Sequence, residues 1–305
     1  MPFDITCYTH REKSQPSMAA QAAFVTGSTG FVALNLVDRL LADGYTVYAL
    51  HRSGSTRVAY LRDLPHAGEK LVVVQGDLCD SNFAALVPAD VTVIFHIAHL
   101  AEDSRNLHSG RVGITAPGFT PEGAAEHRRL NLAAMRNVLA AAENVRRVVY
   151  CSSWSSYGVL PAGTAVDEST PSTAFDCTVP TGLCGGGRVF VPYFASKLEC
   201  EELLRAELEA GRVREGVILQ PCSVFGRYGE AGWCQIFGKL LQSGGRMPGL
   251  PGSSSFCDVQ DLAAAFVAAA TAGPGRCERY VIGGTNASSL EMQSIHGGAC
   301  RGRRA

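Results

Sequence analysis

The sequence predicts an α/β fold in which a doubly wound parallel sheet is followed by a small C-terminal lobe. Short apolar runs alternate with helix-periodic segments from residue 21 to about residue 221, as in sheets whose parallel strands are joined by crossover helices. After Pro221, Gly-rich and Ser-rich connections such as residues 252–255 link shorter elements. A chain of 305 residues is long enough for one large domain with such an appendage.

Each element follows from the spacing of its apolar residues, which is two in strands and about 3.6 in helices. Strands are predicted at residues 22–26, 46–51, 71–75, 92–97, 147–151, 216–220 and 278–282. Helices are predicted at residues 31–42, 122–143, 193–210 and 259–271. Prolines and a run of three glycines interrupt residues 158–191, so we expect a long loop there. Residues 1–20 lack an apolar signal-peptide core and are expected to form a disordered leader.

The composition argues against several classes of partner. A net charge of −1 gives no electrostatic reason to expect nucleic acid or a membrane surface. The longest apolar runs, residues 91–101 and 262–272, are shorter than the ~20 residues that span a bilayer. The 11 cysteines include no C-x-x-C pair and no Cys/His ligand spacing. We therefore predict no metal site and a reducing, cytoplasmic location.

A turn with two glycines joins the first predicted strand to the first predicted helix. Gly27 permits a backbone angle that a side chain opposes, and Gly30 lets the main chain approach a pyrophosphate. The first N–H groups of the helix would hold this anion, favoured by the helix dipole. Two glycines alone also fit an ordinary turn, but a place inside a strand–helix–strand unit favours a dinucleotide site. The candidate residues are Gly27, Thr29, Gly30, Phe31 and Val32.

This stretch resembles the Thr-Gly-x-x-Gly-x-x-Gly/Ala motif of the extended short-chain dehydrogenase/reductase family, with Ala33 at the last position. That family contains epimerases, dihydroflavonol-type reductases and hydroxysteroid dehydrogenases. The resemblance implies a Rossmann fold with an NAD(P)-binding domain at residues 21–221. It also implies a substrate-binding lobe over most of residues 222–305, from which one strand near residues 278–282 returns to the sheet.

Arginines follow the second strand, where NAD-selective folds place a carboxylate that binds the ribose 2′-hydroxyl. The sequence has no Asp or Glu from Tyr45 through Arg62, but it has Arg52 and Arg57. A guanidinium forms charge-assisted, often bidentate contacts with a phosphate, so NADP is predicted in preference to NAD. Arg52 is the candidate selector, although a solvated charge at a strand end is the alternative.

Three further stretches resemble cofactor-side motifs of the family. Gly76-Asp77-Leu78 follows the third strand, and the resemblance implies that Asp77 lies near the adenine amino group, although a helix cap or turn is the alternative. The fourth strand ends at Phe95-His96-Ile97-Ala98, where a small residue lets the backbone run along the cofactor. After the sixth strand, Pro221 and Val224 would pack beside the nicotinamide.

The chemistry is predicted at the start of the third long helix. Tyr193 and Lys197, four residues apart, share one helix face. A phenol ordinarily titrates near ~10, and a neighbouring ammonium favours its phenolate, so the pair is a candidate acid/base for interconverting a carbonyl and an alcohol. The resemblance implies that Ser153 hydrogen-bonds the substrate oxygen and that Lys197 also holds the nicotinamide ribose. Asn131 matches a family asparagine, with a structural role as the alternative.

The first functional hypothesis is an NADP-dependent oxidoreductase that transfers hydride between a nicotinamide and a small-molecule carbonyl or alcohol. The aromatic residues near the predicted site suggest a bulky apolar substrate: Trp154, Phe190, Phe194, Phe225 and Trp233. A nucleotide-sugar epimerase is the near alternative, although Ser223 stands where such enzymes commonly have Asn. A non-catalytic NADP-binding protein is the second, because no apolar helix follows Leu290. A homodimer is one oligomeric state open to the chain.

Overall fold

The computed structural model describes residues 21–100, 121–158, 160, 164–173, 178–180, 188–190, 192–230, 234–235, 237–238, 253–271, 277–288 and 291. A seven-stranded sheet runs through it in the order β11-β8-β5-β4-β1-β2-β3. All six pairings between neighbouring strands are parallel. The strands are β1 (Ala22–Thr26), β2 (Thr46–His51), β3 (Leu71–Gln75), β4 (Val91–His96), β5 (Arg147–Cys151), β8 (Glu215–Pro221) and β11 (Cys277–Ile282).

Strand order reverses between β1 and β4, because β2 and β3 lie on one side of β1 and the later strands lie on the other. This reversal is the switch point of a doubly wound sheet, and ligands of such sheets bind beyond the carboxyl ends of the strands there. The predicted fold class, an α/β doubly wound parallel sheet of the Rossmann type, is therefore confirmed.

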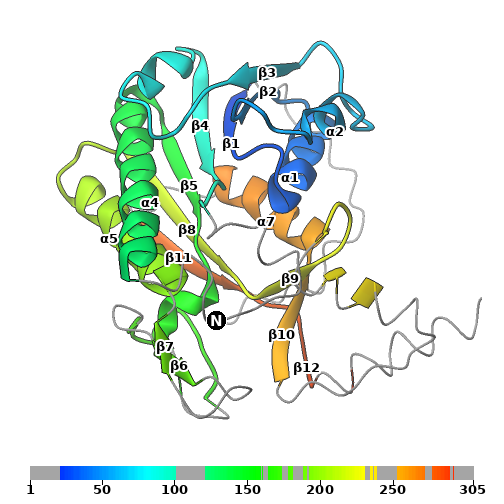
Figure 1. Cartoon of the computed structure of the whole chain (residues 1–305). Helices are drawn as coiled ribbons and strands as arrows, with labels where there is room; N and C mark the ends of the chain where they lie inside the picture. Colours follow the sequence, from blue (N-terminus) through cyan, green and yellow to red (C-terminus); the bar gives the residue numbers. More distant parts are fainter. Residues whose placement is uncertain are drawn as a thin grey trace, which may run out of the picture.

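Two pairs of helices cover the two faces of the sheet (Figure 1). The helices α1 (Phe31–Ala42) and α7 (Val259–Thr271) pack together on one face, and α4 (Pro121–Ala141) and α5 (Pro192–Glu209) pack together on the other. The short helix α2 (Val58–Arg62) follows β2, and single 3-10 turns lie at η2 (Phe83–Leu86), η4 (Ala142–Asn144) and η5 (Trp154–Tyr157).

Alternation along the strands fills both layers of the core. Val25 faces the cluster under α1 and α7, whereas its neighbour Phe24 faces the cluster under α4 and α5. The ring of Phe266 in α7 contacts Phe95 edge to face, with 6.2 Å between the ring centres. Burying one side chain of this size stabilises the fold by about 1.5–3 kcal/mol. Helix α1 ends before Gly44, whose φ of +88° favours glycine.

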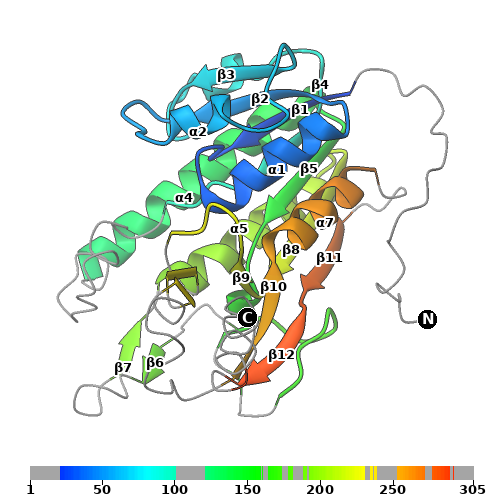
Figure 2. The same cartoon turned by 90° about the vertical axis from the view of Figure 1, so that its right-hand side faces the viewer.

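A second sheet has the order β12-β10-β9, formed by β9 (Ser223–Phe225), β10 (Ser253–Asp258) and β12 (Thr285–Ser288). Strand β10 is parallel to β9 and antiparallel to β12. Figure 2 shows β10 and β12 next to the end of β11. The sequence suggested only a connection at residues 252–255, but Ser253 to Ser255 pair with β12 and begin a strand.

The predicted loop at residues 158–191 also contains regular structure. β6 (Thr178–Pro180) and β7 (Arg188–Phe190) form an antiparallel pair in which Thr178 lies opposite Phe190. The predicted leader at residues 1–20 lies outside the described residues. Among the helices that the structure describes, none combines the length and apolar character needed to cross a membrane.

Candidate cofactor-binding and catalytic site

Most candidate residues lie at or just beyond the carboxyl ends of strands in the large sheet, and Tyr193 and Lys197 lie in the first turns of α5. Turns and connections carry Gly27 after β1, Arg52 after β2, Asp77 after β3, Ala98 after β4 and Ser153 after β5, and Val224 lies in the short strand β9 that follows β8. Because parallel strands end at one edge of the sheet, these residues gather at the edge where doubly wound folds bind ligands.

The glycine turn is packed directly against the end of β4. Gly27 has a φ of +65°, and a β-carbon there would lie 2.9 Å from the Cα atom of Ala98. The Gly30 N–H donates to the Gly27 carbonyl at 2.8 Å, and a β-carbon on Gly30 would lie 3.1 Å from that oxygen. Gly27 therefore has room for backbone only, and Gly30 for little more, as a close-packed pyrophosphate turn requires.

The start of α1 is open to an anion. Gly30 occupies the N-cap position and offers no side-chain acceptor to the first N–H groups, and the Leu34 N–H is bonded to the Gly30 carbonyl at 2.9 Å. Phe31 and Val32 are half-buried. The Thr29 hydroxyl accepts a hydrogen bond from Ser55 Oγ at 3.1 Å, which ties the turn to the segment after β2. These features fit the pyrophosphate of a dinucleotide.

The Thr26 hydroxyl holds the segment after β4 beside the glycine turn. Its oxygen accepts hydrogen bonds from the N–H groups of Ile97 and Ala98, each at 3.1 Å. It also lies 3.0 Å from Nδ1 of His96. Burial and the positive charge of Lys197 lower the pKa of His96 to about 3, so this imidazole is neutral near pH 7.

The two arginines after β2 have different surroundings. Arg57 donates to the Tyr228 carbonyl at 3.0 Å, lies 3.7 Å from a Glu230 carboxylate oxygen, and covers the Tyr60 ring at 5.2 Å. Arg52 is exposed, and its guanidinium has no hydrogen-bond or ion-pair partner in the described part of the chain. Of the two, Arg52 is the guanidinium that a ligand can engage without breaking existing contacts.

Asp77 is exposed, and its Oδ1 accepts a hydrogen bond from the Cys79 N–H at 2.8 Å. This contact is the turn role that the sequence allowed as an alternative. Leu78 is buried, and its carbonyl accepts from Asn137 Nδ2 at 2.8 Å, which anchors the turn to α4.

Helix α5 brings Lys197 to the end of β5. The buried Lys197 ammonium donates to the Cys151 carbonyl at 2.6 Å and lies 5.1 Å from the centre of the Tyr150 ring. Ser153 follows two residues after Cys151, and its hydroxyl accepts from the Ser155 N–H at 3.2 Å. Tyr193 is half-buried, with its ring centre 5.7 Å from the Lys197 nitrogen. The three predicted catalytic residues thus share one end of the sheet.

His99, which contacts Tyr193, and His127, which contacts His99, were not predicted as part of the site. The ring of His99 meets the Tyr193 ring edge to face with centres 4.9 Å apart, and its Nε2 lies 3.2 Å from the Ser196 hydroxyl. His127 lies 5.3 Å from His99, centre to centre. Burial first, and then the Lys197 charge, lowers the pKa of His99 well below its ordinary value, and burial lowers that of His127. The spacing His96-x-x-His99 was the available sequence signal.

Asn131 stabilises the chain that carries His99. Its Oδ1 accepts from the Leu100 N–H at 2.8 Å, and its Nδ2 donates to the Leu100 carbonyl at 3.1 Å. Nδ2 also donates to the His127 carbonyl at 2.9 Å. These contacts give Asn131 the structural role that the sequence allowed.

The remaining candidates lie near the second sheet. Pro221 ends β8 opposite Ile282, and Val224 in β9 pairs with Cys257 and is half-buried. Phe225 does not stand apart as a pocket residue, because it packs in a cluster with Phe237 and Phe256.

Of the other aromatic residues, Trp154 is 41% exposed, and Phe194 contacts Tyr193 with ring centres 6.2 Å apart. Phe190 belongs to β7, and Trp233 lies outside the described residues. Within the described residues, no group of three or more His, Cys, Asp or Glu side chains is arranged to hold a metal ion.

Comparison with known families places the chain in a class. The pattern that defines the NAD dependent epimerase/dehydratase family matches residues 23–283. The chain therefore belongs to this family, which is part of the extended short-chain dehydrogenase/reductase group, as the sequence motifs predicted.

The relatives differ from one another in activity. The chain is 29% identical over 292 residues to a UDP-glucose 4-epimerase of Mycolicibacterium smegmatis, covering 90% of this chain and 81% of that protein. It is 29% identical over 281 residues to a putative dihydroflavonol 4-reductase of Synechocystis sp., covering 88% and 69%. Among solved structures, a dTDP-glucose 4,6-dehydratase of Streptomyces venezuelae with NAD bound is similar in fold, with a TM-score of 0.69, 23% identity, and coverage of 90% and 80%.

These findings establish an enzyme family that uses a nicotinamide dinucleotide. The residues present fit such a group, because glycines at 27 and 30 let the turn pack where a β-carbon would crowd its neighbours, and the start of α1 has no side-chain cap. The prediction of an NAD(P)-dependent enzyme of the extended short-chain type is confirmed at this level.

Proposed function

We propose that the protein is an NADP-dependent oxidoreductase that interconverts a carbonyl and an alcohol by hydride transfer, with Tyr193 as the acid/base. The observation that carries the proposal is the placement of Ser153, Tyr193 and Lys197 at the sheet edge that also holds the glycine turn. The bound dinucleotide supplies or accepts the hydride.

The three side chains have separate roles in proton transfer, substrate binding and cofactor binding. In the reducing direction Tyr193 delivers a proton to the substrate oxygen, and in the oxidising direction it takes that proton back. Ser153 hydrogen-bonds the same oxygen. Lys197, fixed by the Cys151 carbonyl, holds the ribose hydroxyls and places a positive charge beside the phenol. Lys197 has three N–H donors, so its bond to Cys151 leaves two for the ribose.

The preference for NADP rests on Arg52. The exposed guanidinium follows β2, where the ribose of the adenosine half lies in folds of this class. A 2′-phosphate there gains a charge-assisted contact that a 2′-hydroxyl cannot match. Asp77, Leu78, Ala98, Pro221 and Val224 complete the proposed cofactor site, and residues 222–305 supply most of the substrate lobe.

The substrate that we infer is bulky and at least partly apolar. Trp154 follows Ser153 directly and exposes 41% of its surface, and Phe194 lies beside Tyr193. We propose a cytoplasmic location for the enzyme. A homodimer stays a prediction.

A nucleotide-sugar epimerase is the second candidate, favoured by the 29% identity to UDP-glucose 4-epimerase over most of both chains. Such an enzyme uses the same hydride and proton transfers, first in one direction and then in the other. Against it, the Ser223 hydroxyl, where nucleotide-sugar enzymes commonly have Asn, lies 2.6 Å from the Ser254 hydroxyl and is held within the second sheet.

The experiment is a screen of the purified chain for NADPH oxidation with aromatic and aliphatic ketones and aldehydes, beside an assay for interconversion of UDP-glucose and UDP-galactose. We expect NADPH-dependent reduction of one or more bulky carbonyls and no sugar interconversion. Interconversion without net NADPH oxidation would identify the epimerase instead. Cofactor binding with neither activity would favour the non-catalytic alternative.

A further inference from the structure

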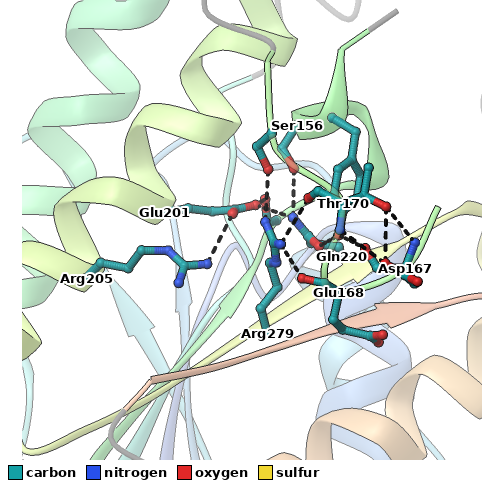
Figure 3. A network of polar contacts seen from close by, with 11 residues as sticks. Ser156, Asp167, Glu168, Thr170, Glu201, Arg205, Gln220 and Arg279 are labelled. Atoms are coloured by element: carbon teal, nitrogen blue, oxygen red, sulfur yellow. Dashed lines mark hydrogen bonds and ion pairs between the residues drawn. The ribbon is translucent and has the colours of Figure 1, made fainter. Parts of the chain in front are cut away.

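A buried polar network joins the turn that carries Ser153 to α5 and β8, and Figure 3 shows its members Ser156, Glu201 and Gln220. Its centre is Glu201 on α5, one helical turn after Lys197, with a fully buried side chain. Oε1 of Glu201 accepts hydrogen bonds from the Ser152 hydroxyl and from Gln220 Nε2, the latter at 2.8 Å. The carboxylate thus joins α5, the end of β5 and β8. We call Ser152, Ser156, Tyr157, Glu201 and Gln220 the Glu201 network.

Gln220 is the second hub of the network and is also fully buried. Its Nε2 donates to the Ser156 hydroxyl at 2.7 Å as well as to Glu201. Its Oε1 accepts from the Tyr157 hydroxyl at 2.7 Å. The amide oxygen and the amide nitrogen of Gln220 are therefore both hydrogen-bonded, the oxygen to the η5 turn and the nitrogen to the η5 turn and α5.

An outer layer closes over the Tyr157 side of the network. The Tyr157 hydroxyl lies 3.1 Å from the Asp167 carbonyl, and the Thr173 hydroxyl donates to the Tyr157 carbonyl at 2.8 Å. Arg279 of β11 lies over the Tyr157 ring at 5.2 Å and donates to the Ser172 hydroxyl at 2.9 Å and the Thr170 carbonyl at 3.2 Å. Residues 164–173 are thereby held against the turn that carries Ser153.

Ser153 itself takes no part in these contacts. Its hydroxyl accepts from the Ser155 N–H, while Ser152, Ser156 and Tyr157 on either side of it are held by Glu201 and Gln220. Hydrogen-bonded side chains around a reacting group fix its position, and fixed positions give transition-state contacts their value. We propose that Glu201 and Gln220 are positioning residues that set the Ser153 hydroxyl relative to Tyr193 and Lys197.

This inference rests on the proposed function, because it assigns Ser153 to the substrate oxygen. The positioning needs the acceptor atoms of Glu201 more than its charge. Oε2 has no hydrogen-bond partner among the described residues, and the cation paired with it, Arg205, is 3.9 Å away. An amide at position 201 can still present one carbonyl oxygen to Ser152 and Gln220, whereas a thioether cannot.

The first test is a double-mutant cycle on turnover. We expect Glu201→Met to lower kcat by about 10- to 100-fold, the size of effect that a misplaced reacting group produces, with cofactor affinity little changed. Glu201→Gln should restore most of the turnover. In a Ser153→Ala background, Glu201→Met should cost less than about threefold, because its target is already gone. Equal losses with and without Ser153 would overturn the proposal, as would a Glu201→Gln variant as impaired as Glu201→Met.

Glu199 supplies the matched control, because it lies on the same helix and pairs with Arg128 at the surface. Glu199→Met should leave turnover near wild type. If Glu201→Met does not fold, Ser152→Ala removes a single hydrogen bond of the network and should show the same dependence on Ser153 at smaller size. A Ser152→Ala loss that is independent of Ser153 would contradict the proposal.

The second test needs no substrate. The N–H groups of Ser155, Ser156 and Gly158 donate within the η5 turn, so their hydrogen exchange reports how well the turn is held. We expect at least about tenfold faster exchange of these amides in Glu201→Met and wild-type exchange in Glu201→Gln, with β1 and β2 unchanged in both. Unaltered exchange in Glu201→Met would refute the positioning role of Glu201. A wild-type protein that reduces no carbonyl would refute only the proposed function.

Discussion

The ammonium of Lys197 lies 5.7 Å from the centre of the Tyr193 ring while it donates a hydrogen bond to the Cys151 carbonyl. One bond thus ties α5 to the last residue of β5, two residues before Ser153. This buried contact holds the catalytic candidates that follow β5 and those on α5 in one arrangement.

Replacing Tyr193 by Phe keeps the ring that packs against His99 but removes the transferable proton. We expect turnover to fall by on the order of 10²–10⁴-fold with cofactor affinity near wild type. Steady-state rates and cofactor titration on the same preparation measure both quantities. A variant with most of its turnover intact would remove Tyr193 from the proposed mechanism.

Lys197→Met should behave differently from Tyr193→Phe. The change removes the positive charge beside the phenol and the donor to Cys151, together with the proposed ribose contacts. We therefore expect weaker cofactor binding as well as lower turnover. Titration with NADPH tests this directly, and unchanged affinity would mean that Lys197 does not hold the ribose.

The two arginines after β2 offer a matched pair for cofactor selectivity. Arg52→Ala should weaken NADPH binding about tenfold or more and leave NADH binding nearly unchanged, because only NADPH loses a phosphate contact. Arg57→Ala should instead lower thermal stability, since Arg57 joins α2 to the Tyr228 carbonyl. Calorimetric titration of each variant with both cofactors decides the assignment. Equal losses for NADPH and NADH in Arg52→Ala would count against it.

The strands of the large sheet were predictable because each is an apolar run between turn residues. β1, β2, β3 and β5 match their predicted bounds, and β4 begins and ends one residue earlier than expected. Helix α4 ends at Ala141, and the next three residues form a 3-10 turn, so the predicted end at residue 143 extends past the α-helix. Local periodicity determines such elements, and their last turns depend on tertiary contacts.

The second sheet was harder to predict. Serines are not typical strand formers, and Ser253 to Ser255 become a strand only because β12 lies opposite them. The pairing of β6 with β7 likewise depends on two short segments that meet across residues 181–187. The residue pattern of one segment does not show which other segment pairs with it.

The candidate site was predictable where a motif fixes residue type and spacing, as at Gly27, Tyr193 and Lys197. Its surroundings were not. The contact of His99 with Tyr193 joins residues 94 positions apart, and that of Arg57 with Tyr228 joins residues 171 positions apart. Arg52 was predicted as the selector without any sign in the sequence that Arg57 is engaged by Tyr228 and Glu230 in the fold.

Gly30→Val should abolish cofactor binding without unfolding the chain. Gly30 has a φ of −78°, which any residue adopts, and a β-carbon there meets the Gly27 carbonyl oxygen at 3.1 Å, a contact that a small shift of the turn relieves. We expect the rest of the valine side chain to occupy the proposed phosphate cradle. We expect normal circular dichroism but no rise in melting temperature when NADPH is added. Gly68→Val is the control, because a β-carbon at Gly68 meets no atom within 4 Å. Full NADPH stabilisation of Gly30→Val would refute the cradle.

The last prediction concerns acid. His96, His99 and His127 lie around Lys197, and burial lowers the pKa of each, that of His96 to about 3. In the unfolded chain a histidine titrates near ~6.5, so below that pH the unfolded state binds protons that the folded state excludes. The contribution of these neutral histidines to the free energy of unfolding is therefore fully present above about pH 6.5. It decreases as the pH falls, by about 1.4 kcal/mol per pH unit for His96 alone.

Urea unfolding between pH 7 and pH 5 measures this slope. His96→Gln should lower this slope by up to about 1.4 kcal/mol per pH unit, because one proton fewer is taken up on unfolding. Equal slopes in wild type and His96→Gln would show that His96 is not held neutral in the fold.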